Sequence, residues 1–248
     1  MSKVILITGA SRGIGRSAAI LAGARGWSVG VNYATNASAA DETVAAVQAA
    51  GGKAIAIQGD VCDEAAIIAM FDATEEAFGQ LDGVVNNAGI VAPGSALADM
   101  DVARLKRIFD TNVLGAYLCA REAARRLSRS RGGKGGAIVN VSSAAARLGA
   151  PNEYVDYAGS KGAIDVLTIG LSKELGPQGV RVNAIRPGLI ETEIHASGGK
   201  PDRAQVLGVQ TPLGRAGTAD EVGESIVWLL SDASSYVTGA IVDVTGGR

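Results

Sequence analysis

Histidine is scarce in this sequence, and its scarcity excludes several kinds of site. The 248 residues contain one histidine, His195. A zinc site built on several histidines is therefore excluded, and a Ser-His-Asp hydrolase would have to depend on that single residue. We expect His195 to be an exposed loop residue or a contact on the substrate side, and we expect no metal site.

Cysteines and long apolar runs are also few. The two cysteines, Cys62 and Cys119, are far apart and form no CxxC pair, which is typical of a reducing compartment without a disulfide framework. No charged amino-terminal segment leads into an apolar stretch with a cleavage site, and no apolar run approaches about 18 residues. We therefore expect a cytoplasmic protein without a membrane partner.

An excess of positive charge is missing as well. The 23 lysines and arginines face 25 acidic residues, which gives a net charge of −2. Nucleic acid requires a basic surface, so we expect no such partner. One basic cluster runs from Arg121 to Lys134. We interpret it as the solvated end of a helix and the following loop, with docking of a phosphorylated carrier as the alternative.

The pattern of apolar segments predicts an α/β fold in one domain, residues 1–248. No linker divides the chain, and 47% hydrophobic residues are ample for a core. Predicted strands at 4–8, 28–33, 53–58, 83–86, 137–142, 181–186 and 241–244 alternate with predicted helices at 14–26, 37–50, 64–78, 102–128, 153–176 and 219–230. This alternation indicates a doubly wound parallel sheet of about seven strands with helices on both faces.

A glycine-rich turn follows the first predicted strand. The segment from Gly9 to Gly15 has the spacing Gly-x3-Gly-x-Gly and lies between a buried strand and a helix start. Glycine lets the backbone approach an anion, and the free N–H groups of the helix end point at it. The segment is thus either a phosphate cradle or a turn with a purely conformational role.

A tyrosine and a lysine lie one helical turn apart, at Tyr157 and Lys161. Residues at i and i+4 share one helix face, and a nearby positive charge lowers the pKa of a phenol. We therefore expect Lys161 to lower the pKa of Tyr157, so that the pair moves a proton to or from an alcohol. Ser142 and Ser143 lie shortly upstream, and one of them can hold the reacting oxygen.

Six motifs in order resemble those of the short-chain dehydrogenase/reductase (SDR) family along the whole chain. They are TGASRGIG (8–15), NNAG (86–89), Asn112 in DTNVLG, a serine before YAGSK, YAGSK itself (157–161) and PGLIET (187–192). Two longer segments further resemble uncharacterised bacterial oxidoreductases described as glucose-dehydrogenase-like or acyl-carrier reductase-like. The resemblance implies a Rossmann-like fold and a homotetramer, with the C-terminal strand near a subunit interface.

The resemblance also implies catalytic roles. Tyr157 is the general acid/base, Lys161 holds the nicotinamide ribose, a serine orients the carbonyl, and Asn112 supports a water that relays protons to Lys161. A solvent-facing asparagine is the alternative for Asn112. Because successive strand residues point to opposite faces, only one serine can face the site, and the family pattern matches Ser143.

The same motifs imply the residues that bind the dinucleotide. We expect these to be Gly9, Ser11, Arg12, Gly13, Ile14, Gly15, Asn32, Tyr33, Asp60, Val61, Asn87, Ala88, Gly89, Tyr157, Lys161, Pro187, Gly188, Ile190 and Thr192. Asp60 matches an adenine contact, although an Asp at this place can also cap the next helix. Asn87 and Gly89 can also stabilise the central sheet.

The sequence further predicts NADP(H) in preference to NAD(H). An acidic residue after the second strand would repel a 2′-phosphate, and Tyr33 occupies that position here. Arg12 can pair with the phosphate, with Asn32, Thr35 and Asn36 as neutral donors. Alternatively, Arg12 merely covers the turn.

We therefore predict an oxidoreductase that transfers hydride between NADP(H) and a small carbonyl compound or secondary alcohol. Residues 191–215 lack strong periodicity and are expected to form a mobile substrate lid. The alternatives are a 3-oxoacyl-carrier reductase, a glucose-type sugar 1-dehydrogenase, and a catalytically silent dinucleotide-binding regulator. Gln178 stands where carrier reductases tend to have arginine.

Overall fold

The computed structural model describes residues 2–248, which form one seven-stranded sheet of parallel strands. The strands, in sheet order, are β3 (Lys53–Gln58), β2 (Ser28–Tyr33), β1 (Val4–Ile7), β4 (Gly83–Asn86), β5 (Gly136–Val141), β6 (Val180–Pro187) and β7 (Ile241–Val244). The order reverses direction between β1 and β4, as in a doubly wound sheet. The predicted fold class is confirmed.

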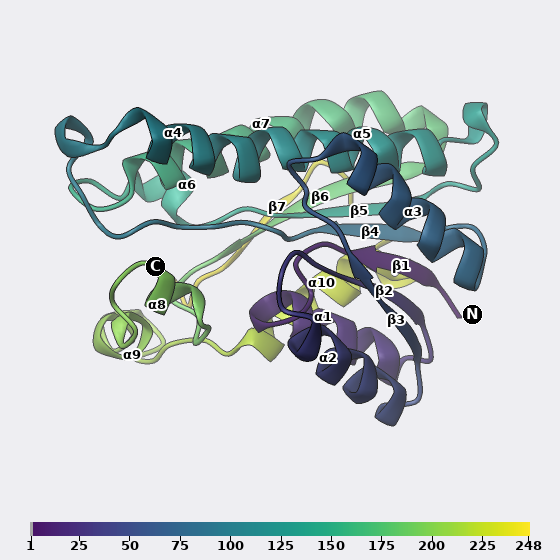
Figure 1. Ribbon diagram of the computed structural model, residues 1–248, viewed down its shortest axis with the longest axis horizontal. Helices are drawn as coiled ribbons and strands as arrows, with labels where there is room; N and C mark the ends of the chain where they lie inside the picture. The colour runs from purple at the N-terminus through teal and green to yellow at the C-terminus, as the bar shows by residue number, and fades with distance from the viewer. Residues whose placement is uncertain (1) are drawn as a thin grey trace.

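Helices cover both faces of this sheet (Figure 1). One face carries α1 (Gly13–Ala24), α2 (Ala37–Ala49) and α10 (Ala219–Leu230), and the other carries α3 (Glu64–Phe78), α5 (Ala116–Leu127) and α7 (Val155–Leu175). Along β1, Ile5 and Ile7 belong to the first apolar core and Leu6 to the second. Burial on both faces explains why the strands are continuous apolar runs.

Side-chain caps fix the start of several helices. Asn36 accepts from the Ala39 amide at 3.1 Å and begins α2, and Asp63 accepts from the Ala65 amide at 2.9 Å and begins α3. Asp63, and not Asp60, therefore caps the helix that follows β3. The Asp60 carboxylate instead accepts from the Cys62 amide at 2.9 Å in the loop after β3.

The single helix predicted over 102–128 is wrong in its middle. The structure has α4 (Val102–Phe109), a π-helical segment η2 (Asp110–Gly115) and then α5. At Gly115 an added Cβ would lie 2.8 Å from the Val61 carbonyl oxygen. A π turn carries one residue more than an α turn, and such turns are frequent at functional sites.

Short helices occupy segments that the apolar pattern left irregular. They are α6 (Ala145–Leu148), α8 (Ile194–Ser197) and α9 (Arg203–Gly208), with 3₁₀ turns η1 (Leu97–Asp99), η3 (Arg129–Arg131), η4 (Gly176–Gln178) and η5 (Asp232–Ser234). Residues 191–215 are thus partly helical. No helix within residues 2–248 is long and apolar enough to cross a membrane.

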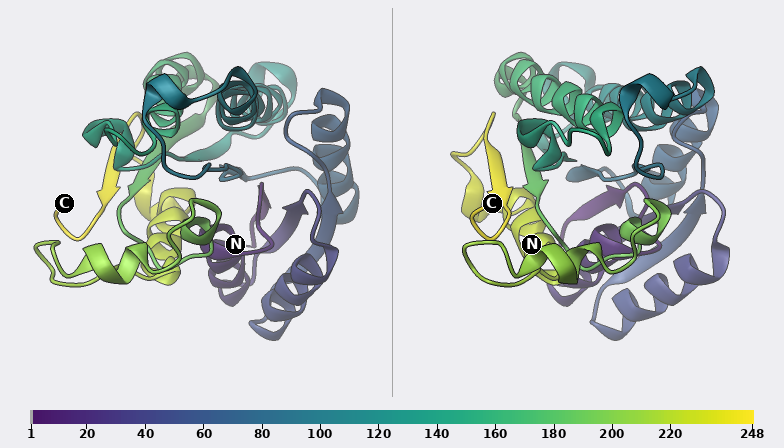
Figure 2. Two further views of the ribbon diagram at one scale, coloured as in Figure 1. Left: turned by 60° about the vertical axis from the view of Figure 1, so that its left-hand side comes forward. Right: turned by 90° about the vertical axis from the view of Figure 1, so that its left-hand side faces the viewer.

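The carboxyl ends of the strands gather the polar motifs at one edge of the sheet. In Figure 1 this edge is on the left, where α6, α8 and α9 also lie, whereas the N-terminus is on the right. The turned views of Figure 2 show the segment of α8 and α9 projecting from this edge below the sheet. Ligands of doubly wound folds bind at such an edge.

Candidate active site

The glycine turn after β1 has the shape of an anion cradle. Gly9 and Gly13 have φ values of 63° and 54°, a region that favours glycine. At Gly15 an added Cβ would lie 2.6 Å from Asn87 Nδ2 and 2.7 Å from the Gly9 carbonyl oxygen. Helix α1 begins at Gly13, and its N-cap residue Arg12 makes no side-chain cap bond. A dinucleotide diphosphate fits this uncapped helix start.

Two side-chain amides hold the turn in place. The Asn87 amide donates to the carbonyl oxygens of Thr8 at 2.8 Å and Gly9 at 3.0 Å. Asn32 Oδ1 accepts from the Gly9 amide at 3.0 Å, while its Nδ2 donates to the Gly59 carbonyl at 2.9 Å. The Asn32 side chain is buried. Its prediction as a neutral donor to the 2′-phosphate needs correction, since its hydrogen bonds are made inside the fold.

The other residues predicted around the dinucleotide spread along the same edge. Arg12 is exposed, Ser11 and Ile14 are partly buried, and Tyr33 packs partly buried against the core at the end of β2. On the far side, Thr192 Cγ2 lies 3.5 Å from the position of a Cβ at Gly13, so Thr192 faces the glycine turn. The remaining positions, Val61, Ala88, Pro187, Gly188 and Ile190, lie at or just beyond strand ends.

Helix α7 places Tyr157 and Lys161 on one face, as predicted. The Lys161 ammonium lies 5.7 Å from the centre of the Tyr157 ring and donates to the Val141 carbonyl at the end of β5, at 2.8 Å. The Lys161 side chain is buried. Burial lowers the pKa of Lys161 to about 8, and the Asp165 carboxylate opposes this.

The two serines have different environments. Ser142 is buried, and its hydroxyl donates to the Lys161 carbonyl at 3.1 Å. Ser143 is partly buried, accepts from the Ala145 amide at 3.1 Å, and its hydroxyl acts on the Tyr157 phenol by lowering the pKa of that group. Of the two, Ser143 is the residue beside the tyrosine.

The expected lowering of the Tyr157 pKa by Lys161 needs correction. Burial raises the pKa of Tyr157, and it is the hydrogen bond with Ser143 that opposes this rise. The Lys161 ammonium is directed to the Val141 carbonyl instead. Burial therefore favours the neutral phenol of Tyr157 over the phenolate.

Asn112 is buried in the π-helical segment, which disagrees with a solvent-facing asparagine. Its Oδ1 accepts from the Ile90 amide at 2.8 Å, and its Nδ2 donates to the Ile90 carbonyl at 2.9 Å and to Ser160 Oγ at 3.1 Å. Gly89 lies between the Lys161 ammonium and the Asn112 side chain. A Cβ there would be 3.3 Å from Lys161 Nζ and 3.4 Å from Asn112 Oδ1.

Comparison with known proteins agrees with this geometry. The family profile described as Enoyl-(Acyl carrier protein) reductase matches residues 9–248. The chain is 51% identical to an uncharacterized oxidoreductase, YgfF, of Escherichia coli K12, over 99% of each chain. It is 40% identical to L-rhamnose 1-dehydrogenase (NAD(P)(+)) of Sphingomonas sp. SKA58, over 99% of this chain and 95% of the relative.

A solved structure shows the same architecture. It is a 3-ketoacyl-(acyl-carrier-protein) reductase of Brucella melitensis complexed with NADH, with a TM-score of 0.91 and 31% identity over 99% of this chain and 98% of that one. The chain belongs to the SDR family. Members are oxidoreductases that act on alcohol or carbonyl groups and bind a nicotinamide dinucleotide.

An ion pair that the sequence did not suggest holds the start of α7, the helix of this SDR chain that carries Tyr157 and Lys161. Asp156, next to Tyr157, is buried and accepts from Arg104 Nε at 2.8 Å and Nη2 at 3.2 Å. Arg104 also donates to the Pro93 carbonyl at 2.5 Å. The pair therefore joins α4, the loop after β4 and the first turn of α7. Spacing gives no signal for it, because the partners are 52 residues apart.

His195 is partly buried rather than exposed. It lies in α8, and its Nε2 is 2.8 Å from the Ile190 carbonyl oxygen. Burial lowers its pKa, so the neutral ring is favoured at neutral pH. Among residues 2–248 no group of three His, Cys, Asp or Glu side chains is arranged to hold a metal ion.

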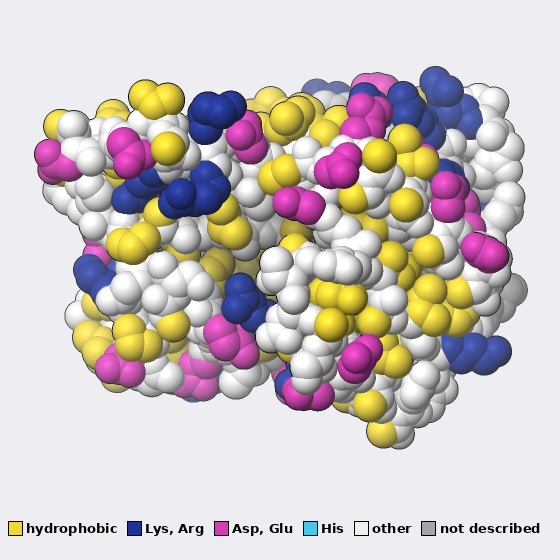
Figure 3. Space-filling model, in the orientation of Figure 1, with side chains coloured by type: hydrophobic (Ala, Val, Ile, Leu, Met, Phe, Trp, Pro, Cys, Tyr) yellow, Lys and Arg dark blue, Asp and Glu magenta, His cyan; other side chains and the backbone are white. Residues whose placement is uncertain are grey.

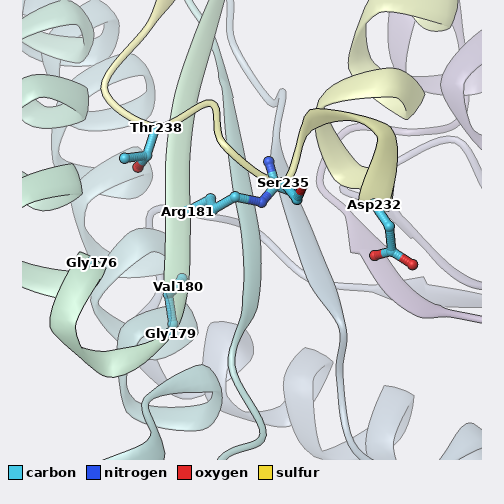
Figure 4. Close-up of a pocket in the computed structure, with 7 residues that line it drawn as sticks. All are labelled: Gly176, Gly179, Val180, Arg181, Asp232, Ser235 and Thr238. Atoms are coloured by element: carbon cyan, nitrogen blue, oxygen red, sulfur yellow. The ribbon is translucent and has the colours of Figure 1, made fainter.

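A surface hollow of about 370 Å³ lies away from these groups (Figure 4). It borders Val180, the first residue of β6, and so lies at the opposite edge of the sheet from Tyr157. Arg181 at this hollow donates to the carbonyl oxygens of Leu229 at 2.8 Å and Ser231 at 3.1 Å. Its guanidinium thus fastens the end of α10, and we do not assign the hollow to catalysis.

Proposed function

We propose that this chain is an NADP(H)-dependent oxidoreductase that interconverts a small carbonyl compound and its secondary alcohol through Ser143, Tyr157, Lys161 and Asn112. The observation that carries the proposal is the geometry of α7 and β5: the Lys161 ammonium lies 5.7 Å from the centre of the Tyr157 ring and donates to the Val141 carbonyl, two residues before Ser143. These groups lie at the same sheet edge as the glycine turn. A proton donor is thereby held next to a dinucleotide cradle.

The residues divide the work in reduction. A bound nicotinamide supplies the hydride. Ser143 donates a hydrogen bond to the substrate oxygen and aligns it with Tyr157, which protonates that oxygen as negative charge develops. Lys161 holds the nicotinamide ribose, with its ammonium 5.7 Å from the centre of the Tyr157 ring. Asn112 holds the backbone at Ile90. Because Gly89 has no side chain, a space remains between the Asn112 side chain and the Lys161 ammonium for proton exchange.

Replacing Tyr157 with Phe tests this mechanism directly. The variant lacks the proton donor but keeps the ring, so kcat should fall by at least about a hundredfold while cofactor affinity stays near that of the wild type. Cofactor affinity is measured by titration of NADPH fluorescence. Activity within about tenfold of wild type would contradict a role for the hydroxyl in proton transfer.

The preference for NADP(H) rests on Arg12 and Tyr33. Arg12 is exposed at the start of α1, and Tyr33 stands where an acidic residue would repel a 2′-phosphate. Arg12→Ala should raise KM for NADPH at least about tenfold and leave KM for NADH nearly unchanged, since a charge-assisted bond is lost with one cofactor only. Tyr33→Asp should shift the preference towards NADH. Equal use of both cofactors by the wild type would refute the preference.

A sugar or another small alcohol is favoured over a carrier-bound acyl chain. The 40% identity with L-rhamnose 1-dehydrogenase supports a sugar as the second candidate substrate. Gln178 occupies the place of a carrier-binding arginine, and its side-chain oxygen accepts from the Ser130 amide at 3.1 Å. A screen of NADPH consumption and NADP⁺ reduction across diketones, keto esters, quinones, acyl thioesters and aldoses separates these substrate classes.

We further propose a homotetramer in the cytoplasm. Large apolar side chains stay exposed on the outer helices, among them Tyr117 on α5 and Val166 on α7, the latter 68% exposed. Tyr236, just before β7, is fully exposed as well. Figure 3 shows acidic and basic side chains mixed on the face it displays, with apolar side chains among them. Light scattering of the purified protein measures the mass.

A further inference from the structure

Two neighbouring residues hold the segment of α8 and α9 against the start of the catalytic helix. The Glu153 carboxylate pairs with Lys200 Nζ at 2.6 Å and with Arg203 Nη2 at 2.7 Å. The Tyr154 hydroxyl donates to the Gly198 carbonyl at 3.3 Å, and the Arg203 guanidinium lies 5.2 Å from the Tyr154 ring centre. We call residues 198–203 the clamped segment.

A strained turn presents these two residues. Ala150 and Asn152 have φ values of 45° and 59°, a left-handed conformation that is unfavourable for residues other than glycine. Such strain persists only where surrounding contacts impose it, and it concentrates at functional sites. The turn is fixed by the Glu153 carbonyl, which accepts from the Ser95 amide at 2.9 Å.

Close packing accompanies the ion pairs. At Gly198 an added Cβ would lie 3.3 Å from the Tyr154 hydroxyl and 3.5 Å from Val91 Cγ1. The clamped segment therefore touches both the turn before α7 and the loop after β4. That loop follows Asn86, the last residue of β4, and includes Gly89, where a Cβ would lie 3.3 Å from Lys161 Nζ, so the clamped segment packs on the loop that borders the catalytic groups.

The charges at the clamp favour a contact that persists at working pH. Hydrogen bonds from Arg203 and Lys200 lower the pKa of Glu153 to about 2, against the effect of burial. Arg203 is mostly buried, at 15% side-chain exposure, which limits screening by salt. Asp202 lies in the same segment but is exposed and makes no ion pair among residues 2–248.

We propose that Glu153 is a positioning residue, which clamps residues 198–203 over the site so that a small substrate is held against Tyr157. Opening of the two ion pairs admits substrate and releases product. The inference rests on the proposed reduction of a small carbonyl compound at Tyr157. It assigns Glu153 a role in substrate affinity and none in the proton transfer.

Hydrogen–deuterium exchange of the full-length protein, without substrate or cofactor, tests the clamp itself. In Glu153→Gln, amides of residues 198–208 should exchange about five- to tenfold faster, because two partly exposed ion pairs are lost. Amides of α10 should keep their wild-type rates. Asp202→Asn is the matched control and should exchange as the wild type does. Unchanged exchange of the clamped segment in Glu153→Gln would overturn the clamp.

Steady-state kinetics then tests positioning. Glu153→Gln should raise substrate KM about three- to tenfold with less than a twofold change in kcat, whereas Asp202→Asn should change neither. The exchanged pair Glu153→Arg with Arg203→Glu should recover at least half of the lost affinity. Faster exchange with an unchanged KM would overturn the positioning role. Wild-type activity in Tyr157→Phe would instead refute the proposed function and leave the exchange result standing.

Discussion

Substitution of each of the two serines before the catalytic helix should separate activity from stability. One substitution should mainly reduce activity, and the other should mainly reduce stability. Ser142 donates its hydrogen bond to the Lys161 carbonyl and is 2% exposed. Ser143 is partly buried, and its hydroxyl lowers the pKa of Tyr157 against the effect of burial. Replacing each serine with Ala removes one hydroxyl from neighbouring places, and the two losses should separate cleanly.

Ser143→Ala should mainly reduce catalysis. Loss of one positioned donor to developing negative charge lowers kcat by about 10²–10³, or roughly 3–4 kcal/mol of transition-state stabilisation. The hydroxyl also opposes the rise in the Tyr157 pKa caused by burial, so its loss makes the phenol a weaker acid. Because Ser143 is partly exposed, the unfolding free energy should fall by less than about 1 kcal/mol.

Ser142→Ala should mainly reduce stability. A buried carbonyl loses a partner, which costs about 1–3 kcal/mol. Because the Lys161 carbonyl lies within α7 and helical carbonyls bond the amide four residues on, the lower end of that range applies. For a chain of this size we expect a Tm decrease of about 2–4 °C for each kcal/mol. The value of kcat/KM should stay within about threefold of wild type.

Calorimetry and steady-state kinetics of the wild type, both single variants and the double variant provide the measurement. The double variant should show the catalytic loss of one serine and the stability loss of the other. If Ser142→Ala lost more activity than Ser143→Ala, the assignment of the reacting serine would be wrong by one residue, and Ser142 would have to face the substrate.

Two further predictions concern groups around the catalytic helix. Gly89→Ala should lower kcat about tenfold or more with a small change in Tm, since the new methyl displaces the flexible end of Lys161 and crowds Asn112; kinetics and calorimetry report both. Asp156→Asn should lower the unfolding free energy by about 3–5 kcal/mol, because it leaves the Arg104 guanidinium without its buried partner. Burial raises the pKa of Asp156, but Arg104 lowers it overall. This stabilisation is therefore present above about pH 4 and is lost as the pH falls further. Urea titrations at pH 3 to 7 should show that the unfolding free energy depends less on pH in the variant than in the wild type.

The sheet could be predicted from the sequence because its signals are local. Strands buried on both faces appear as continuous apolar runs, and β2, β3, β4 and β7 begin and end where the pattern placed them. The gathering of motifs at one edge follows from parallel pairing, because the carboxyl ends of parallel strands meet at the same edge. The predicted proximity of Tyr157, Lys161 and Ser143 has the same origin, since helix periodicity and strand ends fix where such residues lie.

The errors arose where distant parts of the chain decide the outcome. The π-helical segment around Asn112 ends at Gly115, which packs closely against Val61 of another loop, and no helical periodicity reveals such a contact. The Asn32 side-chain amide is chemically able to donate a hydrogen bond to a phosphate, but it is directed inwards to Gly9 and Gly59. Helices α8 and α9 are short, and they are held by Glu153 and Tyr154, about 45 residues earlier, rather than by apolar periodicity of their own.

Burial shifts the pKa values of Tyr157 and Lys161 in opposite directions. It disfavours the charged form of each group, so the pKa of Tyr157 rises above its usual value and that of Lys161 falls to about 8. At neutral pH the phenol keeps its proton and the ammonium is still mostly charged. Under the proposed mechanism this is the state that donates a proton in reduction, whereas oxidation of an alcohol requires the phenolate. Burial keeps the proton on Tyr157 and therefore ties the oxidative direction to higher pH.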